Sequence, residues 1–357
     1  MTATGPGHAF YRFREDDTMI PKTMGGIGML VEIAGGGAIG LAWAVRLAAA
    51  GVGTRLWTRT REQAALIREG GATLAAGDGM VRAAPDARPA EPEAAAEAAA
   101  ADAGRERWII AAMKSHQLTG ESAVRFLRAL AGAEYAPVIC LANGIGHMEY
   151  LAARMPEMPL LHAVTTEGAL REGPAAVRLT GEGRTVIGMH PAIGRKRQIL
   201  LADTLSAAGI AAVLSNNIMN HVYGKLLVNA VVNPLTALFR VKNGELPGDP
   251  VRRRLMRALF HETLAVLKAA GMRTDGGEWD RLLDVIRRTA DNRSSMLVDV
   301  EAGRPTEIDA INGGVARLAR KAGIAAPLNE AVAALVGAIG PNEPGGGLEP
   351  WEHYGKS

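Results

Sequence analysis

The run MLVEIAGGGAIGLAWAVRLAAAG, at residues 29–51, decides the first half of the fold. It opens with a short apolar stretch, passes through a cluster of glycines and continues as a longer apolar stretch that closes at Gly51. The short stretch is typical of a buried strand and the long one of an apolar helix, with the glycines allowing a tight turn between them. The run therefore predicts the first strand, turn and helix of a parallel α/β sheet.

The glycines of this turn have the spacing of a dinucleotide-binding motif. Gly35, Gly37 and Gly40 form G-x-G-x-x-G, in which backbone amides and a helix N-terminus can hold a pyrophosphate. The pattern alone is a weak signal, because the chain holds 43 glycines. Its position between a predicted strand and a predicted helix is what favours a dinucleotide ligand over a chance tight turn.

Further apolar runs predict the rest of the sheet. They are TRLWT at 54–58, WIIAAM at 108–113, PVICLA at 137–142 and LLHAV at 160–164. Helical or alanine-rich stretches separate them, as in a doubly wound sheet. The stretches AVRLT and RTVIGM flank the turn signal GEG and predict an antiparallel hairpin near residues 176–189. The alanine-rich segment 83–103 is expected to be an exposed helix with irregular flanks or a mobile crossover.

The strand signals stop after about Asn216, and the remainder has the spacing of successive helices. We therefore expect an α/β, Rossmann-type N-terminal domain followed by an all-α C-terminal domain. The predicted boundaries are a flexible extension at 1–28, the nucleotide-binding domain at 29–216, a helical substrate and catalytic domain at 217–345 and a tail at 346–357.

Composition excludes several classes of function. The chain has 357 residues, enough for two domains, and a formal charge of only +3 without a basic block, so nucleic acid is not an expected partner. We find no run of 18 apolar residues and no apolar signal-peptide centre, so membrane insertion and secretion are not expected. Cys140 is the only cysteine, which excludes an internal disulfide and fits a reducing cytoplasm.

Three residues follow predicted strands directly and are candidates for contact with a cofactor. Arg59 follows TRLWT at the position where NAD enzymes tend to place an acid for the ribose 2′-hydroxyl. An arginine there can instead pair with a 2′-phosphate, with Arg61 as a helper, which favours NADP(H) over NAD(H). Lys114 and Asn143 follow the next two runs, and ligands of open α/β sheets lie at the carboxyl ends of strands.

A polar stripe marks one helix of the second half. Lys225, Asn229 and Asn233 recur every fourth residue within YGKLLVNAVVNPLTAL and share one helix face. Burying an unpaired lysine is costly, so we expect this face to line a cleft. Pro234 disfavours helical geometry at Asn233 and is expected to end or bend the helix there.

From the glycine turn to GLEPW near the end, the chain resembles the ketopantoate reductase family. The most specific motifs are KLLVNAVVNPLTAL from Lys225, NGEL from Asn243 and NRSSMLVDVEAGRPTEIDAINGGV from Asn292. The resemblance implies reduction of 2-dehydropantoate to (R)-pantoate with NADPH, in the pathway to pantothenate and coenzyme A. One departure is Tyr223, where the family often has tryptophan; it leaves the fine shape of the pocket in doubt.

The resemblance also implies site residues. Lys225 would donate a proton to the keto oxygen. The substrate would be held by Asn229, Asn233, Asn243, Asn292 and Ser295. The cofactor would be held by Gly35, Gly36, Gly37, Ala38, Ile39, Gly40, Arg59, Lys114, Asn143, Ala169 and Glu307. Glu307 has two candidate roles, accepting from a ribose hydroxyl or orienting a lysine, and an exposed salt bridge near Arg304 is the structural alternative.

The residue types suit this chemistry. Hydride transfer to a ketone develops negative charge on oxygen, which a lysine can stabilise and protonate. No metal is expected, because the histidines lack ligand spacing, and His147, His162, His190 and His221 are interpreted as structural or surface groups.

Two other functions remain open. A paralogue could reduce a different 2-keto acid with the same chemistry, or a non-enzymatic NADP(H) sensor could keep the fold without turnover. The set Lys225, Asn229, Asn233, Ser295 and Glu307 argues against the sensor. The partner is then a small 2-keto acid, and the apolar helical domain could support a homodimer.

Overall fold

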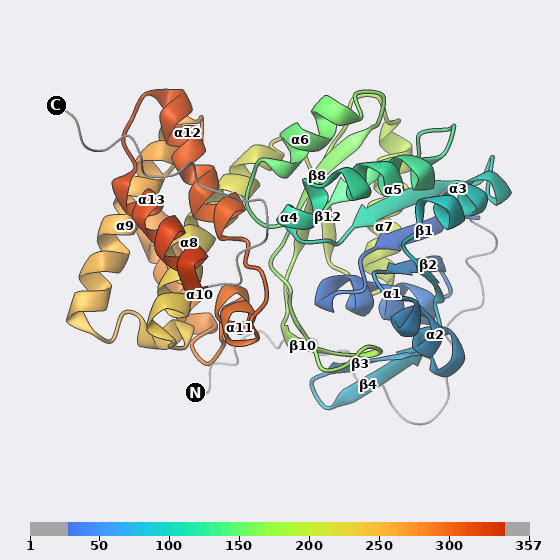
Figure 1. The fold of residues 1–357 in the computed structure, drawn as a ribbon, viewed down its shortest axis with the longest axis horizontal. Coiled ribbons are helices and arrows are strands. Elements are labelled where there is room, and N and C mark those ends of the chain that lie inside the picture. The colour runs from blue at the N-terminus through green and yellow to red at the C-terminus, as the bar shows by residue number, and fades with distance from the viewer. Residues whose placement is uncertain (1–27, 340–357) are drawn as a thin grey trace, which may run out of the picture.

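The computed structural model describes residues 28–339. Except for Gly28, the extension expected at 1–28 lies outside the described residues, and so does the tail expected at 346–357. Figure 1 shows two parts side by side, one built on a sheet with helices and the other of helices. The expected fold class, an α/β domain followed by an all-α domain, is confirmed.

The first domain is organised around an eight-stranded sheet in the order β12-β11-β8-β7-β6-β1-β2-β5. Its strands are β1 (Leu30–Ala34), β2 (Gly53–Thr58), β5 (Asp86–Pro89), β6 (Arg107–Ala111), β7 (Val138–Cys140), β8 (Leu160–Thr165), β11 (Thr185–Gly188) and β12 (Ala212–Ser215). Neighbours pair in parallel except β8 and β11. The strand order reverses between β1 and β6, and the carboxyl ends of the strands at such a reversal are where open α/β sheets bind ligands.

Helices cover both faces of this sheet (Figure 1). They are α1 (Ala38–Ala49), α2 (Arg61–Gly70), α3 (Pro92–Ala101), α4 (Ser115–Leu118), α5 (Glu121–Ala131), α6 (His147–Arg154) and α7 (Arg195–Ala207). One core contains β1 residues with Leu41 and Trp43 of α1, and another contains Ala95 of α3 with Leu127 of α5. The predicted strands at 54–58, 108–113, 137–142 and 160–164 all form, as does the helix after the glycine turn.

A buried carboxylate lies in the middle of the sheet. Glu32 of β1 is fully buried; its Oε1 accepts from Arg55 Nη1 at 2.9 Å and from Arg107 Nη2 at 3.1 Å. Its Oε2 accepts from Trp57 Nε1 at 2.7 Å. Both oxygens are therefore satisfied, as a charge in the interior requires.

A second sheet was not foreseen, and it overturns the predicted hairpin. It has the order β4-β3-β10-β9, with β3 (Ala72–Ala76), β4 (Gly79–Ala83), β9 (Gly168–Arg171) and β10 (Ala176–Gly181). AVRLT forms β10, which pairs with β3 and β9, whereas RTVIGM contains β11, which pairs with β8 and β12 in the large sheet. The GEG segment therefore connects two sheets, because each strand pairs with strands other than the one across the turn.

The segment 83–103 is also more ordered than expected. It contains strand β5 and helix α3, and α3 is not simply exposed, because Ala95, Ala98 and Ala99 are buried. The small alanine side chains let α3 pack closely, while its Glu93 and Glu97 lie on the opposite, exposed side.

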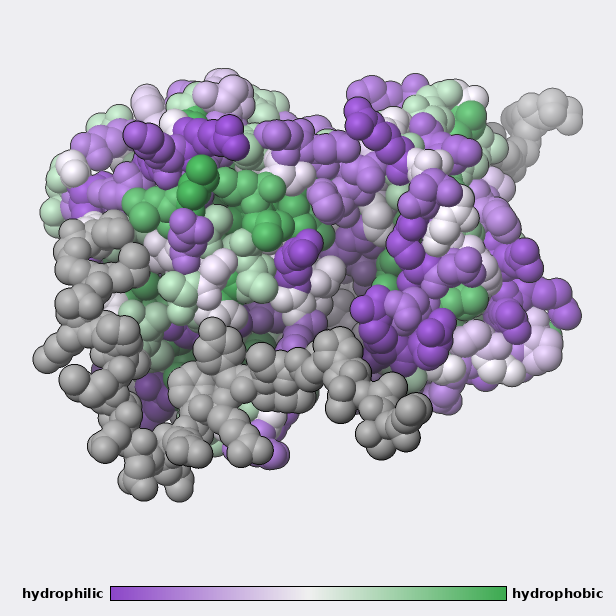
Figure 2. All heavy atoms as spheres, turned by 180° about the vertical axis from the view of Figure 1, so that it is seen from behind, coloured by the Kyte–Doolittle hydropathy of each residue, from purple (hydrophilic) through white to green (hydrophobic). Residues whose placement is uncertain are grey.

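The second domain is helical throughout its described part, as predicted. It comprises α8 (Ile218–Phe239), the 3-10 turn η1 (Asn243–Glu245), α9 (Pro250–Ala269), α10 (Glu278–Arg288), α11 (Ser295–Glu301), the π-helical turn η2 (Asp309–Gly313), α12 (Gly314–Ala322) and α13 (Pro327–Ile339). By length and composition α8 is apolar enough to cross a membrane, but 61% of that apolar window is buried inside the protein. The helix is the centre of the second core. From behind, apolar side chains gather over the sheet domain, whereas the helical domain presents mostly polar ones (Figure 2).

Pro234 does not end α8, which continues to Phe239. A proline lacks the N–H that would bond the carbonyl four residues earlier, here that of Ala230. Asn312 of η2 replaces the missing donor, because its Nδ2 donates to Ala230 O at 2.9 Å and also to Asn329 Oδ1 at 2.9 Å. Of the two expected outcomes, an end of the helix at Asn233 is wrong, because the compensating donor comes from a distant segment. A bend there stays a prediction.

We predict that Asn312→Ala lowers the free energy of unfolding by about 2 to 3 kcal/mol, since it leaves the buried Ala230 carbonyl without a donor. In a Pro234→Ala background the restored N–H can satisfy that carbonyl, so the same substitution should cost about 1 kcal/mol less. Thermal or denaturant unfolding of the four proteins measures both costs. An equal loss in the two backgrounds would contradict the compensating role of Asn312.

Candidate functional site

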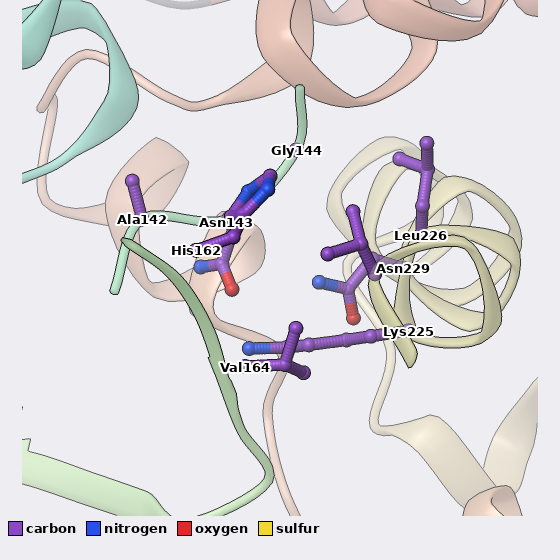
Figure 3. A pocket seen from close by; sticks show the side chains of 9 residues that line it. Ala142, Asn143, Gly144, His162, Val164, Lys225, Leu226 and Asn229 are labelled. Carbon is purple, nitrogen blue, oxygen red and sulfur yellow. The ribbon is translucent and has the colours of Figure 1, made fainter. Parts of the chain in front are cut away.

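A cavity lies between the two domains at the carboxyl ends of β7 and β8. It is lined by Ala142, Asn143, Gly144, His162, Val164, Val222, Lys225, Leu226 and Asn229. In Figure 3 the amides of Asn143 and Asn229 and the amino group of Lys225 project into the same space, from the sheet side and from α8. The structure thus brings together three of the predicted site residues from segments far apart in sequence.

Lys225 reaches this cavity from α8, and its Nζ donates to Thr165 O at 2.7 Å. Burial lowers the pKa of Lys225 from 10.5 to about 8, and the nearby carboxylate of Glu307 partly opposes this shift. The amino group therefore remains mostly protonated at neutral pH. It can deliver a proton more readily than an ordinary lysine, because an ammonium group with a lower pKa is a stronger acid.

Glu307 joins the two sides of the site. It is buried; its Oε1 accepts from the backbone N–H of Ser115 at 3.0 Å, and its Oε2 accepts from Asn143 Nδ2 at 2.7 Å. No hydrogen bond joins it to Lys225, so it acts on the lysine through its charge. The structural alternative of an exposed salt bridge with Arg304 is excluded, because Arg304 pairs with Asp299 at 3.0 Å.

Lys114 follows β6, as predicted, and reaches across to the helical domain. Its Nζ lies 2.5 Å from Asp299 Oδ2 and 3.3 Å from Pro305 O. Asp299 is buried on α11 and was not identified from the sequence. The available signal was an acidic residue within the mainly apolar run SMLVDVE. The pair links the strand end to α11, and the loop that follows α11 carries Glu307.

The remaining substrate candidates lie outside the cavity lining. Asn243 and Asn292 are neighbours, because Asn243 N donates to Asn292 O at 3.0 Å, and Asn243 Nδ2 also donates to Thr289 Oγ1 at 3.0 Å. Asn233 is buried in α8, and Ser295 is the exposed first residue of α11. Of the predicted substrate residues, Asn229 therefore lies at the cavity with Lys225, whereas the other four lie elsewhere in the helical domain.

The glycine turn has the shape that a dinucleotide requires. Gly35 has φ +121°, and a Cβ at Gly40 would lie 2.0 Å from Gly35 O, so neither position accepts a side chain. Helix α1 begins after Gly37 without a side-chain cap, which leaves its first backbone amides available to a ligand. These residues fit a pyrophosphate at the N-terminus of α1.

The two arginines after β2 differ in their surroundings. Arg59 is exposed and makes no hydrogen bond or ion pair with any residue between 28 and 339. Arg61 instead pairs with Glu91 at 2.7 Å, so its predicted helper role would require breaking that pair. Ala169 lies on β9 of the second sheet and packs against the N-terminal core.

His162 was interpreted from the sequence as structural or superficial, but it lines the cavity. Burial lowers its pKa to about 4, so the imidazole is neutral at physiological pH. It packs edge-on against buried His147, with ring centroids 5.2 Å apart. The two-residue period of β8 could have revealed it, since His162 and Val164 share a face of the strand. Within residues 28–339, no three His, Cys, Asp or Glu side chains are grouped as metal ligands.

Comparisons with known proteins match both domains. A family model described as Ketopantoate reductase PanE/ApbA matches residues 31–192, and a model of the C terminal part of the same family matches residues 217–340. A 2-dehydropantoate 2-reductase of Halobacterium salinarum is 30% identical and covers 86% of this chain and 98% of the relative. One from Bacillus subtilis is 32% identical over 80% of this chain and 89% of its own.

Solved structures agree. A PanE/ApbA family ketopantoate reductase from Ralstonia eutropha superposes with a TM-score of 0.76 at 27% identity, covering 87% of this chain and 98% of the other. D-mandelate dehydrogenase, solved in a ternary structure with NADH and anilino(oxo)acetate, superposes with a TM-score of 0.74 at 26% identity, with the same coverage.

We predict that Lys225 titrates with a pKa near 8, so that its charge is lost as the pH rises through that value. In Glu307→Gln the pKa should fall further, because the carboxylate that favours the charged form is gone. NMR of labelled lysine side chains, assigned with Lys225→Arg, measures both values. A midpoint near 10, or one unmoved by Glu307→Gln, would contradict the electrostatic coupling.

Proposed function

Because this chain belongs to the ketopantoate reductase family, we propose that it reduces 2-dehydropantoate to (R)-pantoate with NADPH, on the pathway to pantothenate and coenzyme A. The observation that carries the proposal is Lys225, whose pKa is lowered to about 8 where it faces Asn143 and Asn229 in a cavity between the domains. Reduction of a ketone needs a proton donor close to the cofactor, and Lys225 lies at the carboxyl ends of the strands of a dinucleotide-binding type of domain.

The bound nicotinamide supplies the hydride in this chemistry. The chain's own part is to hold the ketone against Lys225 and to supply the proton. The Lys225 ammonium stabilises the negative charge that develops on the keto oxygen and then transfers a proton to it. Its bond to Thr165 O aims the amino group toward the sheet side of the cavity, and Glu307 keeps it charged at neutral pH.

The substrate is assigned to the polar residues that extend from the cavity. Asn229 offers a donor and an acceptor beside Lys225. Asn233, Asn243, Asn292 and Ser295 are proposed to hold the carboxylate and the distal hydroxyl. The pair of Asn243 with Asn292 supports a shared role for these two.

The preference for NADPH is assigned to Arg59. No acid stands at the end of β2, and Arg59 is exposed with its charge uncompensated by residues 28–339. A guanidinium in that state can pair with a 2′-phosphate in a charge-assisted, bidentate contact. Asn143, Glu307, Lys114 and Ala169 are proposed to hold the nicotinamide half of the cofactor.

The second candidate is reduction of another 2-keto acid. The similarity to D-mandelate dehydrogenase favours it, because that enzyme shares the fold with a TM-score of 0.74. The neutral ring of His162 and the apolar side chains of Val164 and Leu226 line the cavity, and such details set substrate choice more than the fold does.

We place the reaction in the cytoplasm, with a diffusible small molecule as substrate. Cys140 is a free, buried thiol whose pKa is raised to about 12 by burial, so it is an inert core residue. A homodimer through the helical domain remains part of the proposal, and size-exclusion chromatography with light scattering tests it.

The purified protein should oxidise NADPH with ketopantoate faster than with other 2-keto acids, and Lys225→Ala should lower kcat by roughly 100-fold or more. NADPH binding should survive in the variant. Lys268→Ala, which removes an exposed lysine at the end of α9, is the control and should keep normal turnover. Turnover of an aromatic keto acid in preference to ketopantoate would move the assignment to the second candidate. Near-normal activity of Lys225→Ala would refute the mechanism.

Arg59→Ala should weaken NADPH binding by about 1.5 to 3 kcal/mol, the range for a hydrogen bond to a charged group, and leave NADH binding unchanged. The matched control is Arg61→Ala, since Arg61 is already paired with Glu91. Fluorescence titration with both cofactors gives the two dissociation constants. Equal weakening of NADPH and NADH would contradict the assignment of Arg59 to the 2′-phosphate.

A further inference from the structure

The second sheet brings an arginine to the glycine turn. Arg171 is the last residue of β9, and its Nη1 lies 3.4 Å from the carbonyl oxygen of Gly36. Gly36 is the central residue of the turn between β1 and α1, so a cation from outside the large sheet lies beside the predicted pyrophosphate site. None of the sequence motifs indicated this residue.

The position of Arg171 is held by a second contact. Buried Gln63 of α2 donates through Nε2 to Gly36 O at 2.9 Å and to Pro174 O at 2.8 Å. It therefore ties the glycine turn to the loop that follows β9. This buried amide keeps the end of the strand, with Arg171, against the turn.

The charge of Arg171 is not compensated. Among residues 28–339 no carboxylate forms an ion pair with it. The adjacent Glu172 pairs instead with Arg178 at 2.6 Å. Arg171 is exposed, and a single carbonyl occupies only one of its five N–H donors. Arg59, at the end of β2, is likewise unpaired within the described residues. Two free guanidinium groups thus accompany the uncapped N-terminus of α1.

We propose that Arg171 binds a phosphate group of the nicotinamide dinucleotide, an inference that rests on the proposed function. A guanidinium matches a phosphate in a charge-assisted, bidentate contact. Two parts of the proposed cofactor would offer it a phosphate, the pyrophosphate at the start of α1 and the 2′-phosphate beside Arg59. In either case the second sheet contributes directly to the cofactor site.

Arg171→Gln tests the proposal through binding alone. We expect the dissociation constant of NADPH, measured by fluorescence titration at low salt, to rise roughly 5- to 30-fold, and the effect to shrink as salt screens the charge. A parallel rise for NADH identifies the pyrophosphate as the partner, whereas a rise for NADPH alone identifies the 2′-phosphate. Arg171→Lys keeps the charge but loses the bidentate contact, so its dissociation constants should fall between those of the wild type and Arg171→Gln.

Arg82→Gln is the matched control. Arg82 lies on β4 of the same sheet and also bonds to a backbone carbonyl, that of Gly70 at the far end of α2. Its loss should leave both dissociation constants within about twofold of the wild type, since it is remote from the turn. Unchanged binding of both cofactors by Arg171→Gln, with wild-type protein binding normally, would overturn the inference. Absence of binding by the wild type would instead refute the proposed function.

Discussion

A single buried carboxylate, that of Glu307, joins the two domains at the site. One oxygen accepts from the backbone of Ser115 and the other from the side chain of Asn143, both in the sheet domain. The same group also acts on Lys225, because its charge raises the pKa of the amino group against the lowering effect of burial. The orientation of Asn143, the charge of Lys225 and the approach of η2 to the strand ends therefore all depend on this group. The backbone bond from Ile145 N to Ala310 O, at 2.9 Å, fixes the same junction a few residues further along.

The parts of the fold set by local pattern could be predicted from the sequence. The strand, glycine turn and α1 follow from residues 29–51, and the polar stripe of α8 correctly placed Lys225 and Asn229 on a cavity wall. What failed depends on contacts between distant segments. Pro234 stays inside a helix because Asn312 supplies the donor, and the segments around GEG enter different sheets. The period of β8 places His162 and Val164 on one face of the strand, but only the packing of α8 against that face makes them line a cavity.

The fold of this chain is shared by proteins that are named for different substrates. The groups proposed to take part in the reduction come from the strand ends and from α8, which belong to the packed cores. The wall made by His162, Val164 and Leu226 is not assigned to the proposed proton transfer. Because Val164 and Leu226 also belong to the second core, their replacement would repack that core as well as reshape the cavity. The fold that this chain shares with ketopantoate reductases and D-mandelate dehydrogenase fits this separation of reaction from recognition.

The charged trio in the sheet has a consequence for how the chain folds. Glu32 stands opposite Arg55 in the parallel pairing of β1 with β2, and Arg107 approaches it from β6. The register of an apolar strand, such as the IIA part of β6, is normally set by which of its two faces must be buried. In a sheet covered on both faces that constraint is weak. A slip of one residue here would strand an ionised carboxylate in the interior, at a cost of several kcal/mol. The trio thus favours the native register of the central strands, because a shifted register would separate the buried carboxylate from its two arginine partners.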